Sequence, residues 1–201
     1  MTQPPSTLAT YDARPTVYTE QLGTEQLRIV PLVPDEDLDL VYAWVKEERA
    51  RFWGMTEYSR KDVLEVYHFL DPLETHHAFL VLLDGEPKAL FQTYEPLHDP
   101  VGEAYPARVE DVGMHLLLAP AKQPAPDFTP RLVSALIRFL FTDPAIDRII
   151  VEPDARNSKA VRRLETTCFE LGPVIQLAEK EAQLAFLTRE RFEKIAAFKN
   201  R

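Results

Sequence analysis

The chain has 201 residues, 45% of them hydrophobic and 27% charged, and its formal net charge is −9. This length favours one domain with a full hydrophobic core, and no apolar run approaches the ~18 residues that a membrane helix needs. The negative charge argues against nucleic acid and anionic membranes as partners. The single cysteine, Cys168, excludes an internal disulfide and a cysteine-based zinc site, and we expect no metal.

The start of the chain is polar and contains prolines, so residues 1–16 are expected to form a flexible N-terminal segment. This segment lacks the basic region followed by an apolar region that marks a signal peptide, and we therefore expect a cytoplasmic protein. Residues 17–201 are expected to form a single domain.

The first regular element expected is a strand at 27–32, where apolar and polar residues alternate. Helices are expected at 34–48 and 60–72, because apolar residues recur there at helical spacing. Ser59 is the expected N-cap of the second of these helices.

The rest of the chain mixes strands and helices. Strands are expected at 77–85 and 88–96, joined as a hairpin at Asp84-Gly85, and at 112–120. The remaining elements expected are a helix at 129–141, a strand at 147–153, a helix at 155–167 and a closing strand pair at 173–179 and 181–190. Strand–helix–strand units beside hairpins predict an α+β fold, with helices on both faces of a mixed sheet.

This order of elements is similar to that of the Gcn5-related N-acetyltransferase (GNAT) fold. Three segments resemble its siderophore-biosynthesis branch more specifically: RFWGM (51–55), DVGMHLLLAP (111–120) and VEPDARNSKAVRRLE (151–165). That branch includes the aerobactin, desferrioxamine and mycobactin acyltransferases, which acylate the hydroxylated side-chain amine of lysine, ornithine or a diamine. The resemblance covers roughly residues 16–192.

The resemblance implies a mixed, mostly antiparallel sheet with a V-shaped splay between strands 4 and 5 of that fold. It also implies acyl-CoA as the co-substrate, either acetyl-CoA or succinyl-CoA, and a hydroxamate product. The partners expected are therefore acyl-CoA and a small amine acceptor, in a monomer or a homodimer.

His115 lies inside an apolar strand, where it shares a face with Gly113 and Leu117. A histidine in such a strand is more often a hydrogen-bonded core residue than a catalyst. In the branch that the chain resembles, a histidine on the fourth strand and an aspartate after the fifth flank the acceptor. These positions match His115 and Asp154, which are therefore the expected catalytic residues.

The expected reaction asks for a group that removes a proton from the acceptor nitrogen and a donor for the oxyanion. His115 is expected to orient the hydroxylamine or take its proton, and Asp154 to bind its hydroxyl or fix the imidazole tautomer, or the reverse. The backbone N–H of Leu116 or Leu117 suits the oxyanion. A simpler alternative makes Asp154 the N-cap of the helix that begins near Arg156.

The loop APAKQPAPDFTPRL (119–132) has four prolines and no glycine, whereas GNAT enzymes usually bind the CoA pyrophosphate on a glycine-rich turn. We expect Thr129 to cap the following helix, with Pro130 in its first turn and free N–H groups near Arg131–Val133 facing the anion. The alternative is a stiff surface loop with exposed cations. The residues expected to bind the cofactor are Leu116, Leu117, Leu118, Lys122, Phe128, Thr129, Arg131 and Asn157.

Two further segments are expected to border the acceptor. Trp53 and Met55 flank a helix break at Gly54, where aromatic residues are usually core filling but border the acceptor pocket in the branch resembled. Tyr94 and Glu95 lie at a polar strand end, which is either a solvated turn or a site for the distant charged group of the acceptor.

Three functions are therefore open. The leading one is transfer of an acyl group to N6-hydroxylysine or N-hydroxycadaverine in siderophore biosynthesis. The second is a generic GNAT acetyltransferase of another amine, such as an aminoglycoside. The third is a catalytically degenerate GNAT-like binding module, which only the glycine-free loop supports.

Overall fold

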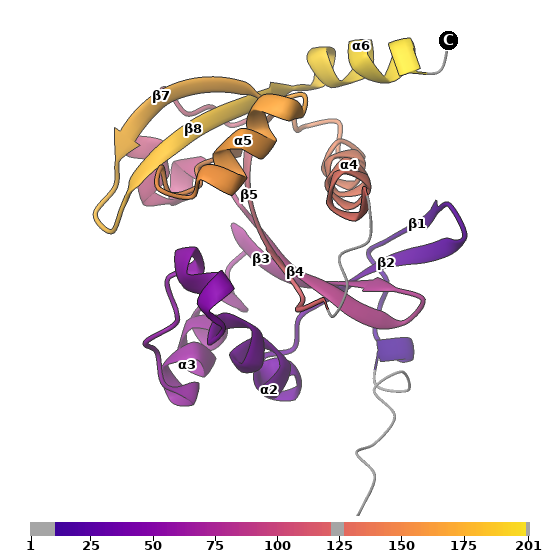
Figure 1. The fold of residues 1–201 in the computed structure, drawn as a ribbon, viewed down its shortest axis with the longest axis vertical. Coiled ribbons are helices and arrows are strands. Elements are labelled where there is room, and N and C mark those ends of the chain that lie inside the picture. Colours follow the sequence, from indigo (N-terminus) through magenta and orange to yellow (C-terminus); the bar gives the residue numbers. More distant parts are fainter. Residues whose placement is uncertain (1–10, 122–126, 200–201) are drawn as a thin grey trace, which may run out of the picture. The chain divides into compact units, whose positions relative to one another are not determined.

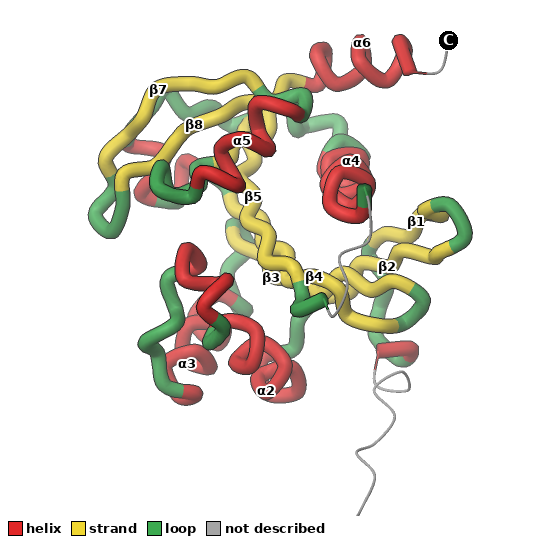
Figure 2. Tube along the Cα trace, viewed as in Figure 1, coloured by secondary structure: helices red, strands yellow, loops and turns green. Residues whose placement is uncertain are grey.

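A computed structural model of the chain describes residues 11–121 and 127–199. The described residues form an eight-stranded, mostly antiparallel mixed sheet with the strand order β1-β2-β3-β4-β5-β6-β8-β7 (Figures 1 and 2). The α+β fold class expected from the sequence is thereby confirmed. No helix in the described part of the chain combines the length and apolar character needed to cross a bilayer.

The strands and the α-helices of the described chain have the following bounds. The strands are β1 (Tyr18–Leu22), β2 (Glu25–Pro31), β3 (His76–Leu83), β4 (Glu86–Tyr94), β5 (Asp111–Leu118), β6 (Arg148–Val151), β7 (Glu170–Gln176) and β8 (Glu181–Thr188). The α-helices are α2 (Pro34–Val45), α3 (Arg60–Leu70), α4 (Phe128–Leu140), α5 (Ser158–Thr166) and α6 (Arg189–Lys199), and short 3-10 helices span η1 (Glu48–Trp53), η2 (Pro96–His98) and η3 (Pro100–Glu103).

The described residues divide into two compact units, 11–92 with 116–121 and 93–115 with 127–199. In the first unit, α2 and α3 lie side by side and pack on the antiparallel strands β2 and β3 and on β4 (Figure 1). Their shared core buries Val30, Leu38, Val41, Val45, Val63, Tyr67, Leu80, Leu82 and Leu90. Burial of such side chains contributes roughly 1.5–3 kcal/mol each, which explains why these two amphipathic helices form here.

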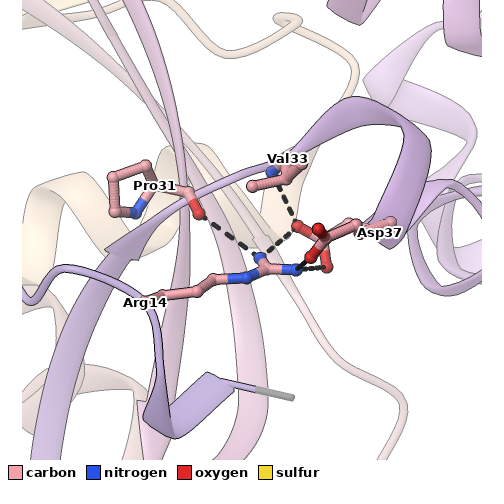
Figure 3. Close-up of polar contacts among 5 residues, drawn as sticks. Arg14, Pro31, Val33 and Asp37 are labelled. Atoms are coloured by element: carbon pink, nitrogen blue, oxygen red, sulfur yellow. Dashed lines mark hydrogen bonds and ion pairs between the residues drawn. The ribbon is translucent and has the colours of Figure 1, made fainter.

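The N-terminal segment is held in place from Tyr11 onward, which differs from the flexible segment expected at 1–16. Tyr11 is only 4% exposed, and Arg14 makes an ion pair with the buried carboxylate of Asp37 at 2.5 and 2.9 Å. In Figure 3 the guanidinium lies between that carboxylate and the Pro31 carbonyl, while Asp37 also accepts from the Val33 N–H at 2.8 Å. The carboxylate thereby ties the start of α2 to the N-terminal segment. Residues 1–10 lie outside the described chain.

In the second unit, β5 and β6 form a parallel pair that is short. Asp111, Val112 and Gly113 pair with Arg148, Ile149 and Ile150, and the pairing ends there although β5 continues to Leu118. This early end agrees with the expected V-shaped splay, since β5 and β6 are the fourth and fifth strands of the fold resembled. At the base of the pair, Arg148 binds the fully buried Asp111 carboxylate through two hydrogen bonds of 2.7 Å.

Two elements were not expected from the sequence, strand β1 and helix α6. Strand β1 pairs with β2 on one side only and carries few apolar residues, so its pattern did not distinguish it from a loop. The strand expected at 181–190 ends at Thr188, and helix α6 follows directly. Ser59 is confirmed as the N-cap of α3, where it forms a capping box with Asp62.

Candidate active site

The second unit gathers three polar side chains around one buried carboxylate, that of Glu152, which is 4% exposed and follows β6 directly. One carboxylate oxygen, Oε1, bonds with Nε2 of His115 on β5. The other, Oε2, accepts a hydrogen bond of 2.7 Å from the hydroxyl of Tyr94 at the end of β4. The ammonium nitrogen of Lys180, in the turn between β7 and β8, lies 3.7 Å from Oε1.

The strand register explains why His115 meets Glu152. The parallel pairing joins each residue of β5 with the residue 37 positions later in β6, as in Gly113 with Ile150. Continued by two residues, this register puts His115 opposite Glu152. Because side chains alternate along a strand, residues 111, 113 and 115 share a face. The Asp111–Arg148 and His115–Glu152 pairs thus follow the same register, with Gly113–Ile150 between them.

Gly113 makes room for this arrangement. The ring of Tyr94 lies directly over Gly113, on the face that His115 shares, and its centroid is 5.0 Å from that of the imidazole. The ring contact and the hydrogen bond to Glu152 leave Tyr94 only 3% exposed. Tyr94 was expected to bind the acceptor; the structure instead makes it a buried partner of the carboxylate.

The charges of these groups depend on one another. Burial raises the pKa of Glu152, but the opposing effects of His115, Lys180 and the Tyr94 hydroxyl are stronger and lower it to about 2. Burial lowers the pKa of His115, but the Glu152 carboxylate outweighs this effect, and the net pKa is raised above its usual value. Burial and the adjacent carboxylate raise the pKa of Tyr94 well above its usual value. Glu152 is therefore ionised and Tyr94 is a neutral donor at neutral pH.

This arrangement suits proton transfer. When Nε2–H of His115 donates to Glu152, the second ring nitrogen, Nδ1, carries the lone pair and can accept a proton. The carboxylate then stabilises the imidazolium that forms. The side chain of His115 is 38% exposed, so a small molecule can approach it.

Asp154 has a different environment from the one expected. Its oxygens accept hydrogen bonds from the Arg156 side chain at 2.6 and 2.9 Å and from the Arg156 backbone N–H at 2.8 Å. The N-cap of α5 is Asn157, whose side chain accepts from the Ala160 N–H at 3.2 Å. The carboxylate that holds the imidazole is thus Glu152, which the sequence analysis missed. The sequence did contain a signal for Glu152: like His115, it is an ionisable residue next to a run of apolar strand residues.

In the first unit, the hydrogen bonds of the β5 backbone show which N–H groups of residues 116–118 point away from β4. The Ala119 N–H donates to the Lys88 carbonyl of β4 at 2.8 Å, and N–H groups alternate in direction along a strand. The N–H of Leu117 therefore also points toward β4, whereas those of Leu116 and Leu118 point toward the opposite edge. On that edge Arg49 donates to the Leu118 carbonyl at 2.6 Å. This leaves Leu116, rather than Leu117, as the candidate oxyanion donor.

The start of α4 also differs from the expectation. Asp127, in a left-handed conformation with φ 56°, is the N-cap rather than Thr129. The Arg131 N–H donates to the Asp127 carbonyl at 3.1 Å, and Pro130 has no N–H, so the expected free donor at Arg131 is wrong. Phe128 and Thr129 are the first-turn positions whose N–H groups an α-helix leaves to other partners. They stay the expected donors to an anion of the cofactor, while Lys122 lies outside the described residues.

The expected acceptor-binding residues fall in both units. Trp53 and Met55 pack against the core of the first unit, beside Gly54, whose φ of 86° ends η1. Tyr67 of α3 is 2% exposed and lies in the same core. In the second unit, the exposed Glu95 lies 3.7 Å from His98. Among the residues described, no group of three or more His, Cys, Asp or Glu side chains is placed to hold a metal ion.

Two characterised relatives cover most of the chain. An aminoglycoside N(6')-acetyltransferase type 1 of Serratia marcescens is 28% identical over 174 residues, 83% of this chain and 86% of the relative. An N-hydroxyputrescine acetyltransferase of Acinetobacter baumannii is 27% identical over 180 residues, 87% of this chain and 83% of the relative. The relatives thus include both classes of acceptor that the sequence analysis left open.

Comparison with solved structures and family models gives the fold and the activity. The aminoglycoside acetyltransferase AAC(6')-Ib in complex with coenzyme A and kanamycin superposes with a TM-score of 0.73 at 27% identity, covering 84% of this chain and 98% of that one. The model of the acetyltransferase (GNAT) domain matches residues 33–177. The expected transferase activity and the acyl-CoA co-substrate are thereby confirmed, and the chain belongs to the GNAT acetyltransferase family.

Proposed function

We propose that this enzyme transfers the acyl group of acetyl-CoA or succinyl-CoA to the hydroxylated nitrogen of N6-hydroxylysine or N-hydroxycadaverine, as a step of siderophore biosynthesis. The observation that carries the proposal is the His115–Glu152 pair in the second unit. His115 is at the strand position that matches the histidine of the siderophore branch. The similarity to an N-hydroxyputrescine acetyltransferase supports the same class of acceptor.

The chemistry of a hydroxylamine suits this pair. A hydroxylamine nitrogen is far less basic than an alkylamine and is therefore neutral at physiological pH, so it attacks the thioester without prior deprotonation. The tetrahedral intermediate must then lose a proton from nitrogen. Nδ1 of His115 accepts that proton, and Glu152 stabilises the resulting imidazolium. The N–H of Leu116 is the proposed donor to the oxyanion.

Asp154 stays a proposed second contact to the acceptor. Its side chain is 5% exposed, whereas that of its partner Arg156 is 75% exposed. Because an exposed arginine reorients at little cost, the carboxylate can exchange this partner for the acceptor hydroxyl. Its pKa is lowered, chiefly by the Arg156 hydrogen bond, so it would enter the reaction as an acceptor of hydrogen bonds.

The alternative acceptor is an aminoglycoside, and the 28% identity to an aminoglycoside acetyltransferase over 174 residues favours it. An aminoglycoside amine is mostly protonated at neutral pH and must lose a proton before it attacks. The same imidazole can accept that proton. The acyl-CoA-dependent transfer is common to both.

Thiol release from acetyl-CoA and from succinyl-CoA tests the proposal. The acceptors are N6-hydroxylysine, N-hydroxycadaverine, lysine, cadaverine and kanamycin, each with the wild type and the His115→Gln and Asp154→Asn variants. The matched control is His68→Gln, because His68 is 48% exposed and pairs with Asp35 on the surface of the first unit. We expect turnover with the hydroxylated acceptors, lost in His115→Gln and retained in His68→Gln. Faster turnover with kanamycin would favour the aminoglycoside alternative, and equal turnover of lysine and N6-hydroxylysine would contradict the proposal.

A further inference from the structure

Two basic side chains converge on a single oxygen of Glu152. Oε1 bonds with Nε2 of His115 and lies 3.7 Å from the ammonium of Lys180. The Lys180 side chain is 18% exposed and that of Glu152 is 4% exposed. Solvent therefore screens the attraction between Glu152 and Lys180 weakly, and the protonation state of His115 depends on both neighbours.

Charge balance shows what Lys180 does there. A buried carboxylate is stable when a positive charge compensates it. With Lys180 present, Glu152 has a permanent cation, and His115 can be neutral without leaving the carboxylate unbalanced. Without Lys180, the imidazolium is the nearest cation to Oε1, and the carboxylate holds His115 in its protonated form.

The other groups that face His115 do not replace Lys180. Tyr94 is neutral and donates its hydroxyl to Oε2 of Glu152. Asp99, the N-cap of η3, is an anion and favours the imidazolium, as Glu152 does. Lys180 is a cation and opposes the protonation of His115. Asp154, which also feels Lys180, has its own counter-ion in Arg156.

We propose that Lys180 is a positioning residue of the reaction, which keeps His115 able to accept a proton near neutral pH by sharing the Glu152 carboxylate with it. The turn that carries Lys180 holds it in place, because the Leu177 N–H donates to the Lys180 carbonyl at 2.9 Å and the Gln176 side chain reaches the same carbonyl at 3.4 Å. This inference rests on the proposed role of His115 as the proton acceptor, but its test does not need turnover.

The test is the titration of His115, followed by nitrogen NMR of the imidazole in the wild-type enzyme and in Lys180→Met and Lys180→Arg. The chain has five histidines, and the spectrum of His115→Gln assigns the signal. We expect Lys180→Met to raise the titration midpoint of His115 by about half to one pH unit, because the opposing charge is removed. Lys180→Arg keeps the charge and should keep the midpoint.

Lys194→Met is the control, since Lys194 pairs with Glu190 on the exposed surface of α6 and should leave the midpoint unchanged. The second readout is the acidic limb of the pH profile of kcat/KM, which should shift in Lys180→Met by the same amount as the NMR midpoint. At a pH below the His115 midpoints of both the wild type and Lys180→Met, the variant should therefore have a kcat/KM lower by up to about tenfold.

A His115 midpoint that is unchanged or lower in Lys180→Met overturns the inference. A raised KM for the acceptor without a shifted midpoint also overturns it, since Lys180 would then bind substrate. A shifted midpoint in an enzyme that does not use hydroxylated amines would leave this inference standing and remove only the proposed acceptor.

Discussion

The ring of Tyr94 fills the space that a side chain at position 113 would need: a Cβ built on Gly113 would lie 1.9 Å from Cζ of Tyr94. That ring is in turn hydrogen-bonded to Glu152, which holds His115. The glycine is therefore required by close packing, and it is coupled to the candidate active site through two further side chains.

Gly113→Ala should destabilise the protein by about 1–3 kcal/mol, because the added methyl group must displace a buried ring. Urea denaturation measures the change. The double variant Gly113→Ala with Tyr94→Leu should lose less than the sum of the two single variants, since removal of the ring relieves the clash. Additive losses would show that the ring and the glycine are not coupled.

Glu152→Gln should lower kcat by about tenfold or more with a smaller effect on the KM for acyl-CoA, because the amide cannot stabilise the imidazolium by charge. Steady-state kinetics of thiol release measures both constants. Tyr94→Phe removes only one hydrogen bond to the same carboxylate and should cost much less. An unchanged kcat in Glu152→Gln would contradict the assignment of the pair to proton transfer.

Protonation of Glu152 should lower the free energy of unfolding of the enzyme in acid. Its pKa is lowered to about 2 in the folded protein, from an ordinary value of 4.5. A lowered carboxyl pKa stabilises the folded state above the ordinary value, and this contribution disappears as the pH falls from about 4.5 to about 2. Its size is about 3 kcal/mol.

Unfolding free energies of the wild type and of Glu152→Gln, measured by denaturant between about pH 6 and pH 2, test this effect. The two proteins should differ most at the upper end of the range and approach each other in acid. A difference that stays constant over the whole range would show that Glu152 does not titrate there.

Arg14→Met should destabilise the first unit by about 3 kcal/mol, because it leaves the buried Asp37 carboxylate without its cation. Thermal and urea denaturation measure the loss. The control is Arg60→Met, which breaks an ion pair with Asp39 whose side chains are 55% and 86% exposed, and which should change stability by less than about 1 kcal/mol. If both variants behave alike, the Arg14–Asp37 pair does not hold the N-terminal segment.

The sequence by itself determined the order of most elements, since this order depends on local patterns. Apolar spacing located α2 and α3, the Ser59 cap located the start of α3, and the turn at Asp84-Gly85 located the β3–β4 hairpin. Elements without such a pattern were missed or misplaced. Strand β1 carries few apolar residues, and α6 follows β8 without an intervening loop.

His115 could be singled out from the sequence because an imidazole is unusual within an apolar strand. Its partner could not, because the choice between Glu152 and Asp154 depends on the register of the parallel strands β5 and β6. That register pairs residues 37 positions apart, across a connection that contains α4. Local sequence patterns carry no information about pairing over such a separation. Tertiary packing decided that Glu152 meets the histidine, that Asp154 turns to Arg156, and that Lys180 arrives from the β7–β8 turn.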